Sequence, residues 1–423
     1  MTQASISNRP AMLSTAQALD FLLAAARSVT EVETLPTLQA HRRVLAAGIA
    51  SAIDVPPMTI SAMDGYAVRC ADFAAARHAP DGPPLRLPIS QRVPAGHPAQ
   101  PLAPVSAARV FTGATIPPGA DAVVMQEMTK ADGDAVSFAA TPQVGEWLTA
   151  QGADIRAGAE ILPAGKRLDA QALGLAASVG CATLPVLRRV KVAVFFTGDE
   201  LTMPGEPLKP GAIYNSNRFT LCALLESLGC EVSDFGIVPD QLVDTQAALH
   251  EAARAHDLVL TSGGVSVGEE DHVKPAVESL GRLNLWQIAL KPGKPLAFGE
   301  IDRAGRSSVP PAFFIGLPGN PVSSFVTFLL FVRPFVLRLQ GVSEVAPRVF
   351  KVRADFTQTK ADRRNEFLRA RLNSDGGLDL FANQSSAVLT STVWGDGLID
   401  NPPGHAITAG EFVRFMPFSE LLS

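Results

Sequence analysis

The sequence predicts a multidomain protein of mixed α+β and α/β class. Its 423 residues exceed one ordinary domain and, at roughly 150 residues per domain, indicate two to four. From Asp54 to Trp147 the chain is rich in Pro and Gly, whereas from Val190 onward strand-like and helix-like segments alternate. We therefore expect an elongated N-terminal helical part with an inserted β module, a doubly wound α/β domain and a small C-terminal β-barrel.

The composition excludes several classes of protein. Hydrophobic residues make up 47% and charged residues 18%, which excludes wholesale disorder. The net charge is −5, so we expect no nucleic-acid partner. The four cysteines form no C-x-x-C pair and suit a reducing compartment. No secretory signal is visible, and the apolar run Phe325 to Val332 is far shorter than a membrane helix of roughly 20 residues. A soluble, cytoplasmic protein is predicted.

The N-terminal part should be helical. Ser14 can cap a helix that runs to Val29, because Gln17 occupies the capping-box position. A second helical stretch contains Leu35 and Leu38 and leads to Ile53, and Ala170 to Val179 returns to helical composition after the β module. We assign residues 1–53 plus 148–186 to one helical domain. We assign residues 54–147 to the β module inserted in it.

The next segment has the pattern of an α/β domain. Val190 to Phe196 is a continuous apolar run typical of a buried parallel strand. Leucines then recur at helical spacing, with Gly229 where a helix C-cap belongs: Leu221, Leu224, Leu225 and Leu228. The α/β domain should cover 187–340, and the short alternating segments of 341–423 predict the C-terminal β domain.

Three glycine-containing turns each follow a predicted strand. They are Thr197-Gly-Asp-Glu200, Ser262-Gly-Gly264 and Pro318-Gly-Asn320, the last leading into a helix near Pro321. Ligands bind outside the carboxyl ends of parallel strands, where backbone N–H groups and helix N-termini attract anions. Glycine also serves turn conformation alone, but three such turns at one edge predict a site for a phosphate-bearing ligand.

Acidic residues stand near these turns: Asp199, Glu200, Asp240, Glu269, Glu270 and Asp271. Carboxylates beside a phosphate site indicate an intervening cation, and Mg²⁺ is the usual one. For Asp199 and Asp240 a helix N-cap is an equal alternative.

Basic residues gather in two places. Lys291-Pro-Gly-Lys294 could clamp an anion or form a solvated hairpin. Arg363, Arg364, Arg369 and Arg371 crowd one C-terminal segment, a pattern more often found on a solvated face.

Two other enzyme classes leave no signature. The chain has no G-x-x-x-x-G-K-[ST] and no H-E-x-x-H, which excludes a P-loop NTPase and disfavours a zinc hydrolase. Met63-Asp-Gly-Tyr66 is a turn on composition alone. The residues by themselves predict an anion-binding α/β domain with Mg²⁺, and the reaction stays open.

Seven motifs follow one another along nearly the whole chain: Ser61-Ala-Met-Asp-Gly-Tyr-Ala67, Thr112-Gly-Ala114 with Pro118-Gly-Ala-Asp-Ala-Val123, Gly152-Ala-Asp-Ile155, Thr197-Gly-Asp-Glu200, Thr261 to Gly268 with Asp271, Lys291-Pro-Gly-Lys-Pro295, and Gly316-Leu-Pro-Gly-Asn-Pro-Val322. In this order they resemble the molybdopterin molybdenumtransferase family, the MoeA-type insertases related to the E domain of gephyrin. The resemblance implies Mg²⁺-dependent insertion of molybdate into adenylylated molybdopterin (molybdopterin-AMP), with release of AMP. It also implies a homodimer whose active site lies between the α/β domain of one subunit and the β module of the other.

The resemblance assigns roles residue by residue. It implies catalytic roles for Asp64, Glu200, Asp240, Asp271, Lys291 and Lys294, and metal binding by Asp154, Glu200, Asp240 and Asp271. Substrate-binding positions are Thr112, Thr197, Gly198, Ser262, Gly263, Gly264, Pro318, Gly319, Asn320, Pro321, Arg364 and Ser386. His272 and Ala387 depart from the family pattern.

Two further readings stay open. One is a pterin-binding carrier or scaffold of the same fold, and the other is a molybdopterin adenylyltransferase. The retained carboxylates favour the insertase over the scaffold, and the motifs outside the α/β domain argue against the adenylyltransferase. The implied partners are the adenylyltransferase and the enzymes that accept the cofactor.

Overall fold

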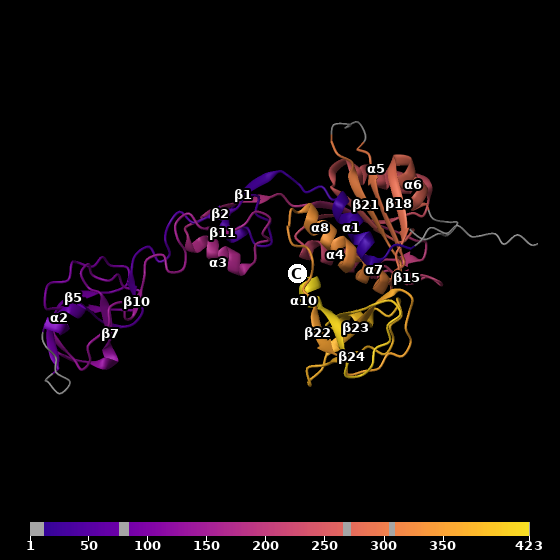
Figure 1. Ribbon diagram of the computed structural model, residues 1–423. Coiled ribbons are helices and arrows are strands. Elements are labelled where there is room, and N and C mark those ends of the chain that lie inside the picture. Colours follow the sequence, from indigo (N-terminus) through magenta and orange to yellow (C-terminus); the bar gives the residue numbers. More distant parts are fainter. Residues whose placement is uncertain (1–11, 76–83, 265–271, 304–308, 423) are drawn as a thin grey trace, which may run out of the picture.

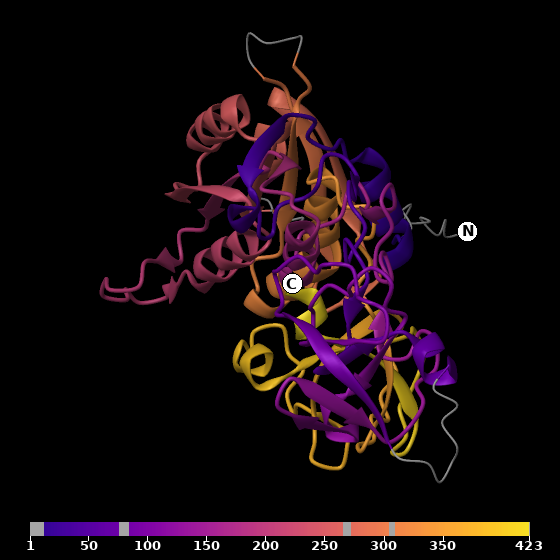
Figure 2. The ribbon, with the colours of Figure 1, turned by 90° about the vertical axis from the view of Figure 1, so that its left-hand side faces the viewer.

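A computed structural model describes residues 12–75, 84–264, 272–303 and 309–422. The molecule is elongated, with the β module at one end, a small middle module next to it, and the α/β and C-terminal β domains together at the other end (Figure 1; Figure 2 gives the view at right angles). This arrangement confirms the predicted fold class. The domain boundaries drawn from composition stay a prediction.

Helix α1 (Thr15–Ala25) has the predicted capping box between Ser14 and Gln17, and it packs on the α/β domain rather than in the middle module.

The middle module contains more strand than we expected. The second helical stretch is wrong, because β1 (Val32–Pro36) pairs antiparallel with β12 (Thr183–Leu187), followed by a 3-10 turn, η1 (Thr37–Gln39). Pro36 disfavours a helical preceding residue and lacks an N–H, which explains the error. Strand β2 (Ile49–Ala50) pairs with β11 (Glu160–Leu162), and α3 (Ala170–Ser178) covers them.

The β module contains a six-stranded sheet of order β7-β4-β6-β5-β9-β8. Its core holds Tyr66, Phe73 and Phe138, whose rings meet edge to face. The elements are β3 (Ile60–Ser61), β4 (Gly65–Val68), α2 (Cys70–Ala75), β5 (Leu85–Val93), β6 (Ala107–Val110), β7 (Ala122–Met125), η2 (Gln126–Met128), β8 (Thr129–Asp132), β9 (Ala135–Phe138) and β10 (Leu148–Thr149), which pairs with β3.

The α/β domain is built on a six-stranded sheet of order β16-β13-β17-β21-β20-β18. Its first four strands are parallel: β16 (Glu231–Val238), β13 (Lys191–Thr197), β17 (Leu258–Ser262) and β21 (Ala312–Leu317). Strands β20 (Pro295–Ile301) and β18 (Gly281–Gln287) add an antiparallel edge. Two short strands, β14 (Leu201–Thr202) and β15 (Ile213–Tyr214), pair outside this sheet.

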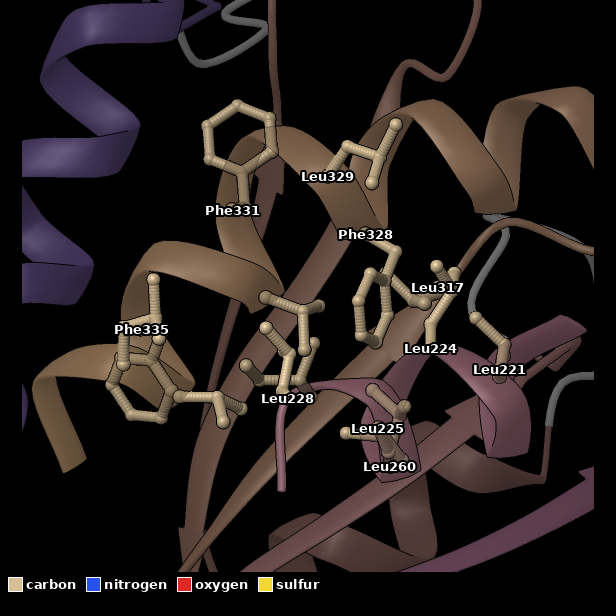
Figure 3. Close-up of a cluster of buried hydrophobic side chains, with 14 of the residues drawn as sticks. Leu221, Leu224, Leu225, Leu228, Leu260, Leu317, Phe328, Leu329, Phe331 and Phe335 are labelled. Carbon is tan, nitrogen blue, oxygen red and sulfur yellow. The ribbon is translucent and has the colours of Figure 1, made fainter. Parts of the chain in front are cut away.

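Successive residues of β13 supply opposite faces of this sheet. Val192, Val194 and Phe196 face a cluster made with α1, α4 (Ser216–Ser227), α7 (Pro321–Thr327), η3 (Phe328–Val332) and α8 (Arg333–Leu339) (Figure 3). Ala193 and Phe195 face α5 (Leu242–Ala255) and α6 (Val273–Leu280). This alternation is what a sheet covered by helices on both faces requires.

Within the described residues, one helical stretch, Pro321–Leu339, is long and apolar enough to span a membrane, with mean hydropathy 1.7 over 18 of its 19 residues. It is longer than the run that we identified from Phe325 to Val332. The structure buries 89% of that window inside the α/β domain, which is the position of a core helix.

The C-terminal sheet has the order β19-β23-β25-β26-β22, with β24 beside β23. Strand β19 (Leu290–Lys291) belongs in sequence to the α/β domain, yet it pairs parallel with β23 (Asn365–Leu372) and so joins the two domains. The other elements are β22 (Phe350–Arg353), β24 (Leu378–Leu380), α9 (Thr390–Trp394), β25 (Gly397–Asn401), β26 (Phe412–Pro417) and α10 (Phe418–Leu421).

Glycine is required in the turn after β17. Gly263 has φ +100°, and a Cβ added there would lie 2.6 Å from the carbonyl oxygen of Thr197. Gly236 in β16 also has a positive φ, +74°, but a Cβ added to it would have no atom within 4 Å. A side chain at either position would therefore meet the same backbone strain, but only a side chain at position 263 would also meet a steric clash.

We predict that Gly263→Ala lowers the free energy of unfolding of the α/β domain more than Gly236→Ala does. Each substitution should cost about 1–2 kcal/mol for the left-handed backbone, and only Gly263→Ala adds the clash with Thr197. Urea unfolding followed by circular dichroism measures both. Equal losses would show that the Thr197 contact adds nothing.

Candidate functional site

A cavity of about 940 Å³ opens where β13, β17 and β21 end. The strands are in register there, with Phe196 opposite Ser262 and Ser262 opposite Leu317, so the three predicted turns meet. A Cβ added to Gly319 would lie 3.9 Å from Gly263 Cα, which shows how closely two of the turns approach. The predicted residues lining the cavity are Thr197, Gly198, Glu200, Asp240, Gly263, Gly264, Lys291, Lys294, Pro318, Gly319, Asn320, Pro321, Arg364 and Ser386.

Ser262 is buried behind this wall and connects two of the turns. Its Oγ donates to the carbonyl oxygen of Pro318 at 3.0 Å and accepts from Asn217 Nδ2 at 2.8 Å. Asn217 also donates to the carbonyl oxygen of Gly319 at 2.8 Å. Sequence reasoning missed Asn217, since an asparagine in the first turn of a helix gives no distinct signal.

Two of the predicted carboxylates, Glu200 and Asp240, line the cavity. The Glu200 carboxylate folds back beside Gly198, where an added Cβ would lie 2.6 Å from Oε2. The N-cap alternative is wrong for both Asp199 and Asp240. The next helix after Asp199 is α4, whose N-cap is Asn215, and the next helix after Asp240 is α5, whose N-cap is Gln241. Neither carboxylate in the cavity therefore serves as a helix cap.

These two carboxylates fit Mg²⁺, which usually takes one or two carboxylates together with substrate phosphates and water. Among the residues that the structure describes, no three His, Cys, Asp or Glu side chains gather as a metal cluster. Asp154 lies elsewhere, in the connection to the β module, where its N–H donates to Val55. Asp271 lies outside the described residues.

Two cations of the cavity, Lys291 and Arg364, are paired with carboxylates of the C-terminal domain. Lys291 Nζ lies 2.8 Å from Glu366 Oε1 and 3.3 Å from Asp362 Oδ2, and Glu366 raises the pKa of Lys291. Arg364 donates from Nε and Nη2 to Asp362 at 3.0 and 2.9 Å, which lowers the pKa of that carboxyl strongly. Sequence reasoning did not find Asp362 or Glu366.

The loop Gln384–Ser386 closes the C-terminal side of the cavity. The Val322 N–H, in the first turn of α7, donates to the carbonyl oxygen of Ser386 at 3.0 Å and so attaches this loop to the α/β domain. Lys294 also lines the cavity, and its ammonium forms no ion pair with any of the described residues.

Asp64 and Thr112 lie together in the β module, at the opposite end of the molecule from the α/β and C-terminal domains (Figure 1), whose residues line the cavity. Asp64 Oδ1 accepts from the N–H and from Oγ1 of Thr112, both at 2.8 Å. The Thr112 N–H lowers the pKa of Asp64 most, followed by its hydroxyl. One chain therefore does not bring Asp64 and Thr112 to the cavity.

Comparison with known proteins covers the whole length of this fold. Family models match residues 13–180 (MoeA N-terminal region, domain I and II), 193–338 (probable molybdopterin binding domain) and 351–418 (MoeA C-terminal region, domain IV). A molybdopterin molybdenumtransferase from Haemophilus influenzae is 39% identical over 97% of this chain and 100% of its own, and one from a Nostoc species is 36% identical over 87% and 84%.

Solved structures show the same architecture. A molybdopterin biosynthesis MoeA protein from Pyrococcus horikosii superposes with a TM-score of 0.76 at 30% identity, covering 96% of this chain and 99% of that one. A second structure from Pyrococcus horikoshii gives 0.81 at 27% identity, covering 96% and 100%. With three family models in order and a relative of this identity along its full length, the chain belongs to the molybdopterin molybdenumtransferase (MoeA) family.

Proposed function

We propose that this protein is a molybdenum insertase, which inserts molybdate into adenylylated molybdopterin and releases AMP in the final step of molybdenum cofactor synthesis. The observation that carries the proposal is the cavity at the strand ends, where glycine turns, two carboxylates and three cationic side chains meet. The family's molybdopterin-binding model covers the domain that forms most of this cavity.

The cavity walls differ in charge, which supports a division of roles. The turns at Gly198, Gly263 and Gly319 can offer backbone N–H groups to phosphate oxygens. Thr197 Oγ1 is buried at this wall and has no hydrogen-bond partner among the described residues, so it can bind the substrate. Lys291, Lys294 and Arg364 can hold oxyanions, since molybdate is a dianion that favours cationic donors.

Glu200 and Asp240 are the residues that would hold Mg²⁺ and orient water at the phosphoanhydride. Bound there, the cation would neutralise the negative charge of the phosphates and of the leaving AMP. The protein itself must hold the pterin dithiolene and the oxyanion next to each other in a reactive orientation.

The active site is completed by a second copy of the chain. Asp64 and Thr112 form a prepared hydrogen-bonded pair, yet they lie far from the cavity of their own chain. We therefore propose a homodimer in which Asp64 of the partner subunit reaches the cavity. The enzyme would act in the cytoplasm, receiving substrate from an adenylyltransferase and delivering the cofactor to acceptor enzymes.

We expect purified protein to release AMP from adenylylated molybdopterin only when both Mg²⁺ and molybdate are present. Chromatography quantifies the AMP, and absorption spectroscopy follows the metal-bound dithiolene. Tight binding of the pterin without any AMP release would instead indicate a carrier or scaffold, and absence of binding would remove the proposal.

Glu200→Gln should lower the rate of AMP release by about a hundredfold, because the substitution removes a charge that orients the cation and water at the reacting bond. Glu206→Gln is the matched control, since Glu206 is exposed and does not line the cavity. If Glu200→Gln releases AMP at the parent rate, Glu200 has no such role.

Subunit complementation tests the shared site. Asp64→Asn and Glu200→Gln should each be nearly inactive alone. A mixed dimer, isolated through two different tags, should recover about half of the parent rate, because one of its two sites combines intact residues from both chains. Inactive mixed dimers would contradict a site shared between subunits.

A further inference from the structure

Arg369 is a fully buried arginine in strand β23, with 0% of its surface exposed. Its guanidinium contacts only neutral acceptors: Nε donates to Ser391 Oγ at 3.1 Å, Nη1 to the carbonyl oxygen of Phe367 at 3.3 Å, and Nη2 to that of Ser385 at 3.2 Å. No described carboxylate forms an ion pair with it. A buried charge without a counter-ion is unfavourable for stability, so its presence in the core calls for an explanation.

The guanidinium keeps its charge at neutral pH. Burial lowers the pKa of Arg369 to about 10, which still leaves the group protonated near pH 7. Arg371, two residues along the same strand, is by contrast partly exposed and lies 3.6 Å from Asp379. The same side chain is therefore buried without a carboxylate partner at position 369 and exposed beside a carboxylate at position 371.

Arg369 lies directly behind the cavity wall. Its Nη2 group holds the carbonyl oxygen of Ser385, and Ser385 and Ser386 both line the cavity. The Gln384 side chain brackets the Arg369 backbone, accepting from its N–H at 2.9 Å and donating to its carbonyl oxygen at 3.0 Å. The loop Gln384–Ser386 and the guanidinium thus form one unit.

On this side of the cavity, two cationic side chains are paired with carboxylates, whereas Arg369 is not. Lys291 and Arg364 are balanced by Glu366 and Asp362. Lys294, which lines the cavity, and Arg369, behind its wall, have no described counter-ion, and neither has the exposed Arg363 beside Lys294. Lys294 and Arg369 together carry two positive charges, as many as the negative charges of molybdate.

We propose that Arg369 is a positioning residue of the molybdate subsite, where it holds the loop Gln384–Ser386 and supplies an uncompensated positive charge behind it. This inference rests on the proposed function for the identity of the anion. Direct contact with molybdate is left to the residues that line the cavity, and Arg369 acts through the loop and through its field.

The main test compares Arg369→Met, which removes the charge at similar length, with Arg369→Lys, which keeps it. Arg371→Met is the matched control, since it removes a charge from the exposed position on the same strand. In the full-length protein we expect Arg369→Met to raise the molybdate dissociation constant, measured by calorimetry, about tenfold, the size expected for coupling between partly screened charges. Arg369→Lys and Arg371→Met should remain within about threefold of the parent.

A second pair of variants leaves the arginine in place, in case Arg369→Met does not fold. Ser391→Asp puts a carboxylate beside Nε and neutralises the guanidinium, whereas Ser391→Asn has nearly the same shape without the charge. We expect only Ser391→Asp to weaken molybdate binding and to raise the molybdate KM, while kcat and the affinity for adenylylated molybdopterin change little.

Equal binding by Arg369→Met and the parent overturns the inference, as does an equal loss in Ser391→Asp and Ser391→Asn. Equal loss in folded Arg369→Met and Arg369→Lys would reduce Arg369 to a structural role and also overturns it. The proposed function fails separately: a parent that binds molybdate but never releases AMP would contradict the insertase and leave the calorimetric comparison intact.

Discussion

The site depends on one constraint, the register of three parallel strands. Because Phe196, Ser262 and Leu317 stand opposite one another, β13, β17 and β21 end at the same edge and their turns form a single wall. A slip of one residue would exchange the two faces of a strand and bury its turn out of line with the others. The apolar clusters on both faces of the sheet fix this register, and Figure 3 shows part of one of them.

The C-terminal domain forms the other side of the cavity, opposite the wall of turns. Strand β19 crosses from the α/β domain into the C-terminal sheet, which places Lys291 opposite Glu366. The carboxylates of the cavity thus come from the strand ends, while its cations come from the segment around β19 and from the C-terminal domain. Such separation lets one cavity hold a cation and an oxyanion without each attracting the other's ligands.

The sequence predicted the parts of this site that depend on local pattern. The apolar run before Thr197 and the leucine spacing of α4 identified a strand and a helix, and glycine marked the turns between elements. It failed at Leu35 and Leu38, where a helical spacing of leucines competes with Pro36 and with a strand partner about 150 residues away. The four clustered arginines look alike in sequence, yet tertiary neighbours give each a different environment. Arg363 is exposed, Arg364 is paired with Asp362, Arg369 is buried, and Arg371 is exposed beside Asp379.

The place of α1 has a consequence for how the chain folds as it is synthesised. Ala18 and Leu22 pack in the same cluster as Phe335 of α8, although α1 leaves the ribosome roughly 300 residues before α8. At ordinary translation rates that interval lasts on the order of 15 to 60 s. Throughout this interval the apolar face of α1 lacks its α8 partner, so α1 reaches its native packing only after the α/β domain has been synthesised.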